Sequence, residues 1–136
     1  MQNEGVAGVI LKRADQKVLL QYRDALAPRY PLVWGFFGGK IEINETPLET
    51  AIREAKEELG ITVYDAELML HESYSEDSKT YEKWLFCIPA ENHPKLTLNE
   101  GQALGWFSKA EIEQLPMAAH DKQSLNKLMD RIFPLN

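Results

Sequence analysis

The chain has 136 residues and a formal net charge of −6, with 44% apolar and 26% charged residues. This length fits one compact domain, so we expect residues 1–136 to form a single domain. The acidic balance argues against a nucleic-acid backbone or an anionic membrane as the main partner. No apolar run approaches the roughly 20 residues that span a bilayer.

The N-terminus and the cysteine content indicate the cellular compartment. Residues 1–5 lack the basic start and apolar segment of a secretory signal. The single cysteine, Cys87, stands in an apolar run and has no second cysteine to pair with. We interpret it as a buried structural thiol rather than a nucleophile. A cytoplasmic, reducing location is therefore the expectation.

The first quarter of the chain predicts strands joined by turns. β-branched and apolar residues predict strands, whereas proline and polar clusters predict turns and loops. The expected segments are a strand at Val6–Leu11, a turn at 13–17, a strand at Val18–Tyr22, a loop at 25–31 and a short strand at Trp34–Phe37 that ends at Gly38 and Gly39.

The next segment carries the signals of a helix. Thr46 supplies an N-cap hydroxyl, Pro47 the first helical position and Glu49 the capping-box carboxylate. Gly60 supplies the end of the helix. Apolar residues recur between them at helical spacing and predict one core-facing stripe. The stripe consists of Leu48, Ala51, Ile52, Ala55 and Leu59.

The rest of the chain alternates strand-like and helical segments. Strands are expected at Ile61–Val63, Glu67–Tyr74, Thr80–Ile88 and Ala103–Phe107, and helices at Lys109–Leu115 and Lys122–Phe133. Strands mixed with one central and two terminal helices predict a layered α/β fold.

Three glutamates share one flank of the central helix. Glu54, Glu57 and Glu58 are spaced i, i+3 and i+4, which puts their Cβ atoms about 5–6 Å apart. If neighbouring structure holds them there, all three stay ionised only with a cation among them. Carboxylate oxygens suit Mg²⁺ or Mn²⁺. The alternative is a solvated, glutamate-rich helix face.

Residues before and within the helix extend this pattern. Gly38 and Gly39 allow the backbone to approach a ligand, and their carbonyls can bind a metal. Arg53 can orient a neighbouring carboxylate, and Glu45 stands just before the N-cap. A plain turn and a surface ion pair are the simpler interpretations.

From Gly39 to Ile61 the chain resembles the signature of the Nudix hydrolase family. Gly39 is followed by five residues and Glu45, and then, after seven more, by Arg53-Glu54, Ala55-Lys56, Glu57-Glu58 and Leu59-Gly60-Ile61. The flanking segments also resemble the family, in its MutT-like branch. Phe37 stands where many members have proline, and Ala55 is small for its position; neither departure removes a charged group.

The resemblance implies a Nudix-type α/β/α sandwich around a mixed sheet and a magnesium site, with manganese as a substitute. The implied metal ligands are Glu54, Glu57, Glu58 and the Gly38 carbonyl, with Glu100 as a further ligand. Glu45 would support the site by pairing with Arg53, and the implied catalytic set is Glu54, Arg53 and Glu100. Either Glu54 or Glu100 would be the general base.

On the substrate side, the resemblance places phosphate near Arg23, Gly39 and Lys40. Trp34, Phe36 and Trp106 are expected in the core, because aromatic residues in strands are usually buried. Relatives that act on oxidised guanine nucleotides read the base with an amide after a Leu-Pro pair, but the segment 115–121 contains no Asn or Gln. His120 and Asp121 remain candidates there, His120 alternatively as a helix cap.

The expected activity is magnesium-dependent hydrolysis of a nucleoside triphosphate to the monophosphate and pyrophosphate. Nucleotide sugars and dinucleotide polyphosphates are alternative substrates, and a non-catalytic nucleotide sensor or a plain acidic interaction domain are alternative classes. The partner would be a small nucleotide, and the protein a monomer or a homodimer.

Overall fold

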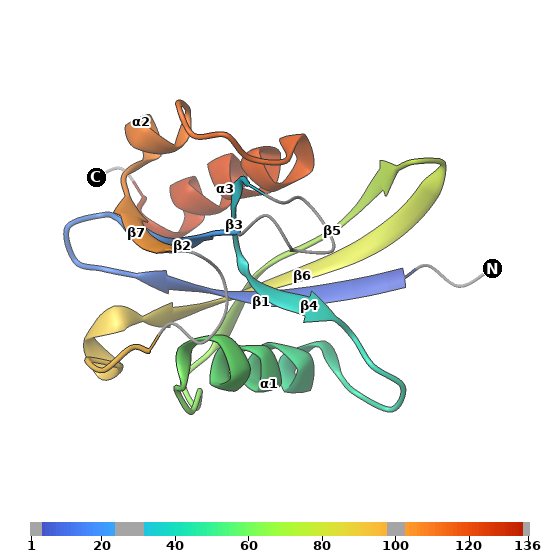
Figure 1. The fold of residues 1–136 in the computed structure, drawn as a ribbon, viewed down its shortest axis with the longest axis horizontal. Helices are drawn as coiled ribbons and strands as arrows, with labels where there is room; N and C mark the ends of the chain where they lie inside the picture. The colour runs from blue at the N-terminus through green and yellow to red at the C-terminus, as the bar shows by residue number, and fades with distance from the viewer. Residues whose placement is uncertain (1–3, 24–31, 98–102, 135–136) are drawn as a thin grey trace.

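The computed structural model describes residues 4–23, 32–97 and 103–134, and Figure 1 shows the fold. The expected loop at 25–31 and Glu100 lie outside these ranges. The elements are β1 (Glu4–Lys12), β2 (Val18–Tyr22), β3 (Trp34–Gly35), β4 (Phe37–Lys40), α1 (Pro47–Leu59), β5 (Glu67–Glu76), β6 (Lys79–Pro89), the 3₁₀ turn η1 (Ala90–Asn92), β7 (Ala103–Phe107), α2 (Lys109–Ile112) and α3 (Ala119–Ile132).

The strands form one mixed sheet. Its order is β3-β2-β1-β6-β5, with β4 paired to β1 and β7 paired to β2. β1 and β6 run parallel over the whole of β1, and the other pairs are antiparallel. The prediction of a mixed α/β sheet is confirmed.

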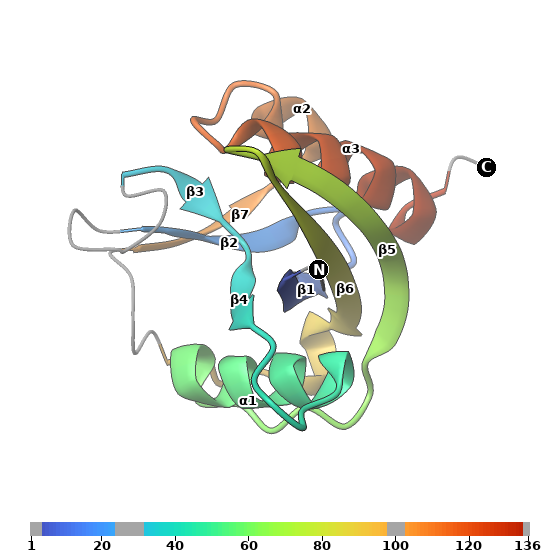
Figure 2. The same ribbon diagram turned by 90° about the vertical axis from the view of Figure 1, so that its right-hand side faces the viewer.

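One edge of β1 is shared between two strands. β2 pairs with β1 at Lys12 opposite Val18, whereas β4 pairs with the same edge along Val6–Val9. β6 occupies the other edge, so β2 must diverge from β1 where β4 begins. Figure 2 shows β4 crossing from β3 toward α1, with β2 and β7 lying apart from it.

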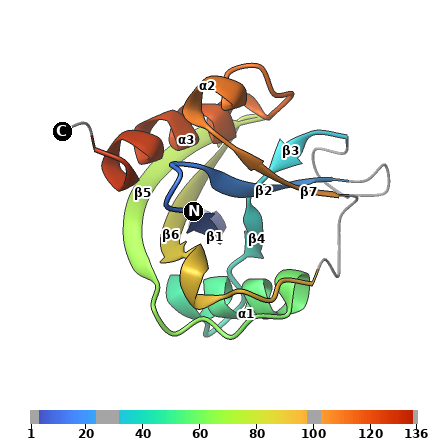
Figure 3. The same cartoon turned by 90° about the vertical axis from the view of Figure 1, so that its left-hand side faces the viewer.

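Helices cover both faces of the sheet. α1 packs on one face, and α2 and α3 pack on the other, as Figures 2 and 3 show from opposite ends. One core cluster, which includes Phe37 and Leu59, lies on the α1 side. A second cluster, which includes Ile10 and Leu128, lies on the α3 side. These layers are the predicted α/β/α sandwich. No helix in the described ranges is long and apolar enough to cross a membrane.

α1 begins and ends where local signals predict. The Thr46 side chain accepts from the Glu49 backbone and the Glu49 carboxylate accepts from the Thr46 backbone, which completes a capping box. Gly60 closes the helix with a left-handed φ of 69°. The predicted apolar stripe is wrong at one end, because Leu48 is 41% exposed. Thr50 is buried instead and donates to Glu45 in the preceding loop.

Several other expectations need correction. Gly38 and Gly39 lie within β4 rather than at the end of a strand, because both pair with β1. Gly38 faces Gly8 so closely that a Cβ would strike the Ala7 backbone, which explains a glycine inside this strand. Residues 61–63 form no strand, although Ile61 and Val63 are buried. The expected helix at 109–115 ends early, at Ile112, and the expected helix at 122–133 begins early, at Ala119.

Candidate active site

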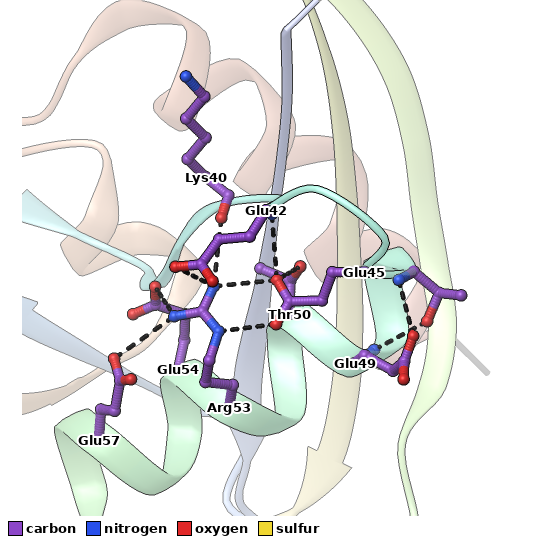
Figure 4. Close-up of polar contacts among 9 residues, drawn as sticks. Lys40, Glu42, Glu45, Glu49, Thr50, Arg53, Glu54 and Glu57 are labelled. Atoms are coloured by element: carbon purple, nitrogen blue, oxygen red, sulfur yellow. Dashed lines mark hydrogen bonds and ion pairs between the residues drawn. The ribbon is translucent and has the colours of Figure 1, made fainter.

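Arg53, on α1, organises the group of charges in Figure 4. Its Nε donates to Glu45 Oε2 at 2.7 Å and its Nη2 donates to Glu45 Oε1 at 3.0 Å, which makes a bidentate pair. Nη2 also lies 3.3 Å from the Lys40 carbonyl oxygen and 3.7 Å from Glu42 Oε1. Arg53 thereby ties α1 to the end of β4 and to the loop between them.

Glu45 is fixed from several directions. It accepts from Arg53, from the Thr50 hydroxyl and from the Glu42 backbone amide. The hydrogen bond from Arg53, reinforced by that from Thr50, lowers the pKa of Glu45 to about 2, while the pKa of Arg53 is raised by the same hydrogen bond. Both groups are therefore charged across the physiological pH range. Thr50 is a part of this group that the sequence analysis missed.

Glu54 and Glu57 face the same guanidinium. Arg53 Nη1 donates to Glu54 Oε1 at 3.0 Å and lies 3.5 Å from Glu57 Oε2. Glu54 has 13% of its side chain exposed and Glu57 has 50%, so Glu57 lies on the open side of the group. The Glu54 carboxylate packs so closely on Gly39 that a Cβ at Gly39 would collide with it. Glycine at position 39 lets the helix carboxylate reach the strand.

Glu58 is separated from the other two glutamates by its burial. It is 4% exposed, and its Oε1 lies 3.5 Å from the side-chain amide of Gln21 in β2. Gln21 also donates to the Phe36 carbonyl oxygen at 3.0 Å. The expected flank of three glutamates is thus two carboxylates around Arg53 and one carboxylate directed toward the sheet. Sequence reasoning did not identify Gln21.

The donor chemistry of this flank fits a hard divalent cation. Across the described ranges, no three acidic, histidine or cysteine side chains converge in an arrangement that would hold a metal ion. Glu54 and Glu57 nevertheless lie within 3.5 Å of one cationic group, and both offer carboxylate oxygens. The two carboxylates need a positive charge nearby to stay ionised together, and a divalent ion would supply it as the guanidinium does.

A pocket of about 350 Å³ lies beside β4 and is lined by residues of β1, β3, β4, β5, β6 and the start of α3. Four of its lining residues are those expected near phosphate or metal, namely Arg23, Gly38, Gly39 and Lys40. The helix glutamates do not line it. Gly39 connects the two regions, because it borders the pocket and also contacts Glu54.

The lining also contains aromatic and apolar side chains. Three further polar residues that line the pocket contact one another: Lys83, His120 and Asp121. Trp34 and Phe36, expected in the core, are half-buried and line the pocket. The alternative of His120 as a helix cap is wrong, because Ala118 is the N-cap of α3 and His120 lies 3.0 Å from Lys83.

Lys83 is the polar residue of this region that the sequence analysis missed. It is 3% exposed on β6, between the buried residues Tyr81 and Leu85. Alternation along a strand puts residues 81, 83 and 85 on one face, so an inward-facing lysine was detectable from this pattern. Such a lysine needs partners, because burying an unpaired ammonium is costly.

The cysteine and two remaining histidines have structural surroundings. Burial raises the pKa of the Cys87 thiol to about 11, which agrees with a structural thiol. His93 is buried and lies 3.1 Å from Asp65 Oδ1, and exposed His71 stacks on Trp84.

A mixed sheet between helices, with an arginine-centred carboxylate group beside a pocket, defines an α/β enzyme domain. The sequence pattern of the NUDIX domain matches residues 2–128. The chain therefore belongs to the NUDIX family and is a Nudix hydrolase.

Individual relatives agree with this assignment. The chain is 33% identical to the CTP pyrophosphohydrolase of Escherichia coli (strain K12) over 124 residues, which are 91% of this chain and 90% of that protein. A shorter stretch of 36 residues is 50% identical to the 8-oxo-dGTP diphosphatase of Proteus vulgaris, covering 26% of this chain and 32% of that protein. A MutT NUDIX hydrolase from Burkholderia pseudomallei superposes with a TM-score of 0.78 at 25% identity, over 94% of this chain and 99% of that one.

Proposed function

We propose that this hydrolase cleaves the pyrophosphate linkage of a nucleoside triphosphate with the help of Mg²⁺, giving the monophosphate and pyrophosphate. The observation that carries the proposal is the position of Gly39, with the Glu54 carboxylate on one side and the pocket on the other. A phosphate chain lying across this glycine would place its anhydride bonds beside the carboxylates. The relatives named for CTP and 8-oxo-dGTP support a triphosphate.

In this proposal Glu54, Glu57 and Glu58 hold the cation, together with the Gly38 carbonyl. Glu100 is a further ligand in the proposal and lies outside the described residues. Bound Mg²⁺, or Mn²⁺ in its place, neutralises phosphate oxygens and lowers the pKa of a bound water. Near-complete burial of Glu58 supports this role, since a cation offsets the cost of a carboxylate held away from water.

The other residues of the group position the carboxylates and the phosphate. Arg53 fixes Glu54, and Glu45 holds Arg53 through the bidentate pair. Arg23 and Lys40 line the pocket and supply positive charge for phosphate, and Gly39 lets the phosphate approach the backbone. Glu54 and Glu100 are the two candidates for the general base that takes the proton of the attacking water.

A substrate panel tests the proposed activity. The purified protein is incubated with nucleoside triphosphates, nucleotide sugars and dinucleotide polyphosphates, with and without Mg²⁺, and the phosphate products are identified. We expect pyrophosphate from triphosphates, with Mg²⁺ required. Release of a sugar phosphate would instead indicate nucleotide sugars, and binding without turnover of any compound would indicate a sensor and contradict the proposal.

The same assay separates the two candidates for the base. Glu54→Gln and Glu100→Gln are compared over a range of Mg²⁺ concentrations. Loss of the base lowers kcat by about 100-fold even at saturating Mg²⁺, whereas loss of a ligand alone is relieved by adding Mg²⁺. Glu113→Gln is a matched control, because Glu113 is exposed beside α2, on the opposite face of the sheet from α1.

A further inference from the structure

Gln21 is a polar residue in a buried and otherwise apolar stretch of β2. It is 2% exposed, and the three residues before it, Val18, Leu19 and Leu20, are buried as well. An apolar side chain would fill such a position at lower cost, because a buried amide loses its hydrogen bonds with water unless the protein replaces them. The contacts of this amide therefore indicate what a glutamine contributes at position 21.

The first contact lies where the chain leaves one strand for another. Phe36 stands between β3 and β4 and belongs to neither; Gly35 before it pairs with Gln21 of β2, and Phe37 after it pairs with β1. Because Phe36 lies outside both ladders, its carbonyl needs another donor. Gln21 Nε2 supplies it at 3.0 Å. Gln21 thereby holds the segment that leads, two residues later, to Gly38.

The second contact of the same nitrogen is with Glu58 on α1. Gln21 Nε2 lies 3.5 Å from Glu58 Oε1, and both residues are buried. A side-chain amide carries two N–H bonds, so it can serve two acceptors at once. The distance is longer than that of a strong hydrogen bond. The amide can therefore orient the carboxylate and still leave its oxygen able to bind a cation, unlike the carboxylate of Glu45, which Arg53 holds by two short bonds.

We propose that Gln21 is a positioning residue of the metal site, whose amide fixes Glu58 of α1 relative to the segment that carries the Gly38 carbonyl. This inference rests on the proposed function, in which Glu58 and the Gly38 carbonyl hold the cation. The two ligands come from different elements, and Gln21 contacts Glu58 on one side and the approach to Gly38 on the other. Residues that orient metal ligands commonly change metal affinity by about 10- to 100-fold.

Binding of Mn²⁺ to the nucleotide-free protein, followed by electron paramagnetic resonance, tests the inference. Gln21→Met keeps an unbranched side chain of similar length but removes both N–H donors. We expect the dissociation constant for Mn²⁺ to rise about tenfold or more, and the Mg²⁺ concentration for half-maximal turnover to rise in parallel. The kcat at saturating Mg²⁺ and the KM for the nucleotide should stay close to those of the natural protein. An unchanged dissociation constant for Mn²⁺ overturns the inference.

Leu20→Val is the matched control for a general loss of packing in β2. Leu20 is buried at the neighbouring position and belongs to the core cluster on the α3 side, away from α1. This variant should lower the melting temperature and leave Mn²⁺ binding unchanged. If it weakens Mn²⁺ binding as much as Gln21→Met does, the effect reflects stability alone and the inference is wrong.

A double-mutant cycle with Glu58→Gln tests whether Gln21 acts through Glu58. Glu58→Gln removes the carboxylate that the amide is proposed to orient, so adding Gln21→Met should weaken Mn²⁺ binding little further. Fully additive losses would show that Gln21 affects the cation by another route, and would refute the proposed role.

A measurement on the natural protein decides if Gln21→Met does not fold. The side-chain amide signals of Gln21 are followed by NMR during a titration with Mg²⁺. They should shift as Glu58 binds the cation, whereas those of the exposed Gln114, which follows α2, should not. Uptake of Mg²⁺ without a shift at Gln21 contradicts the inference.

These outcomes are distinguishable from failure of the proposed activity. A natural protein that hydrolyses nucleotides with Mg²⁺ but loses no Mn²⁺ affinity in Gln21→Met overturns the inference alone. A natural protein that binds Mn²⁺ and hydrolyses no nucleotide overturns the proposed activity alone. A natural protein that takes up no Mn²⁺ overturns the proposed metal site and, with it, the role of Gln21.

Discussion

Two cations organise the two ends of the candidate site, and they differ in burial. Arg53 has 26% of its side chain exposed and shares its donors among Glu45, Glu54, Glu57 and the Lys40 carbonyl. Lys83 has 3% exposed and makes three short contacts, all with α3. The partly solvated group can exchange one partner for another at small cost, whereas the buried group cannot. We therefore expect the first region to tolerate a change of partner and the second to resist it.

The largest expected effect is on turnover, in the partly solvated region around Arg53. Glu57→Gln removes one charge from the flank that we propose to hold the cation. We expect a fall in kcat/KM of about 100-fold or more, with little change in melting temperature because half of this side chain is exposed. Steady-state assays and thermal denaturation of the same preparation check both parts. Unchanged activity would remove Glu57 from the proposed metal site.

The next effect is on stability, and it separates the two cations. Lys83→Met leaves the buried Asp121 carboxylate without its cation and should cost about 3 kcal/mol in the free energy of unfolding. Arg53→Met breaks more ion pairs, but they are partly solvated, so about 1 kcal/mol is expected. Urea denaturation of the two variants measures the difference. Equal losses would contradict the comparison between a buried and a solvated group.

A smaller effect is expected at Thr50, which holds Glu45 and, through it, Arg53. Thr50→Val keeps the shape of this buried side chain but removes the hydrogen bond to Glu45. We expect a loss of about 1 kcal/mol in stability, together with a modest rise in the KM for substrate as Arg53 becomes less fixed. Thr80→Val, at an exposed position of β6, is the matched control and should change neither quantity.

The smallest effect is the pH dependence of the exposed end. Because the pKa of Glu45 falls from its ordinary value of 4.5 to about 2 on folding, its contribution to stability is complete above pH 4.5. That contribution is lost as the pH drops from 4.5 toward 2. Melting temperatures of the natural protein and Glu45→Gln should therefore converge over this interval. A constant difference between the two melting temperatures over this interval would show that the ionisation of Glu45 is not coupled to folding.

The parts of the fold that depend on neighbouring residues were predicted well from the sequence. The parts that depend on pairing between distant segments were not. Thr46, Pro47 and Gly60 act within a few residues of themselves, so the limits of α1 were accessible from the sequence. Gly38 and Gly39 were expected to end a strand, because only their pairing with β1 shows that the strand continues through them. Leu48 fitted the helical period, but Thr50 is buried nearby through its hydrogen bond with the loop.

The candidate site likewise contains contacts that the sequence predicted and contacts that it did not. The pairing of Glu45 with Arg53 followed from the resemblance, and the structure places the two in contact. The buried Glu58 meets Gln21, which stands 37 residues earlier in the chain. The contact of Lys83 with Asp121 spans 38 residues, and no single-helix or single-strand pattern predicts such a meeting.

The split edge of β1 has a consequence for how this protein can change. The split brings β4 against β1, and the small residues of these two strands, Ala7, Gly8, Gly38 and Gly39, line the pocket. Trp34 and Phe36 line the same pocket, so replacing either would change its wall without moving this paired backbone. The lining can thus vary at these two positions while the helix that carries the carboxylates stays as it is.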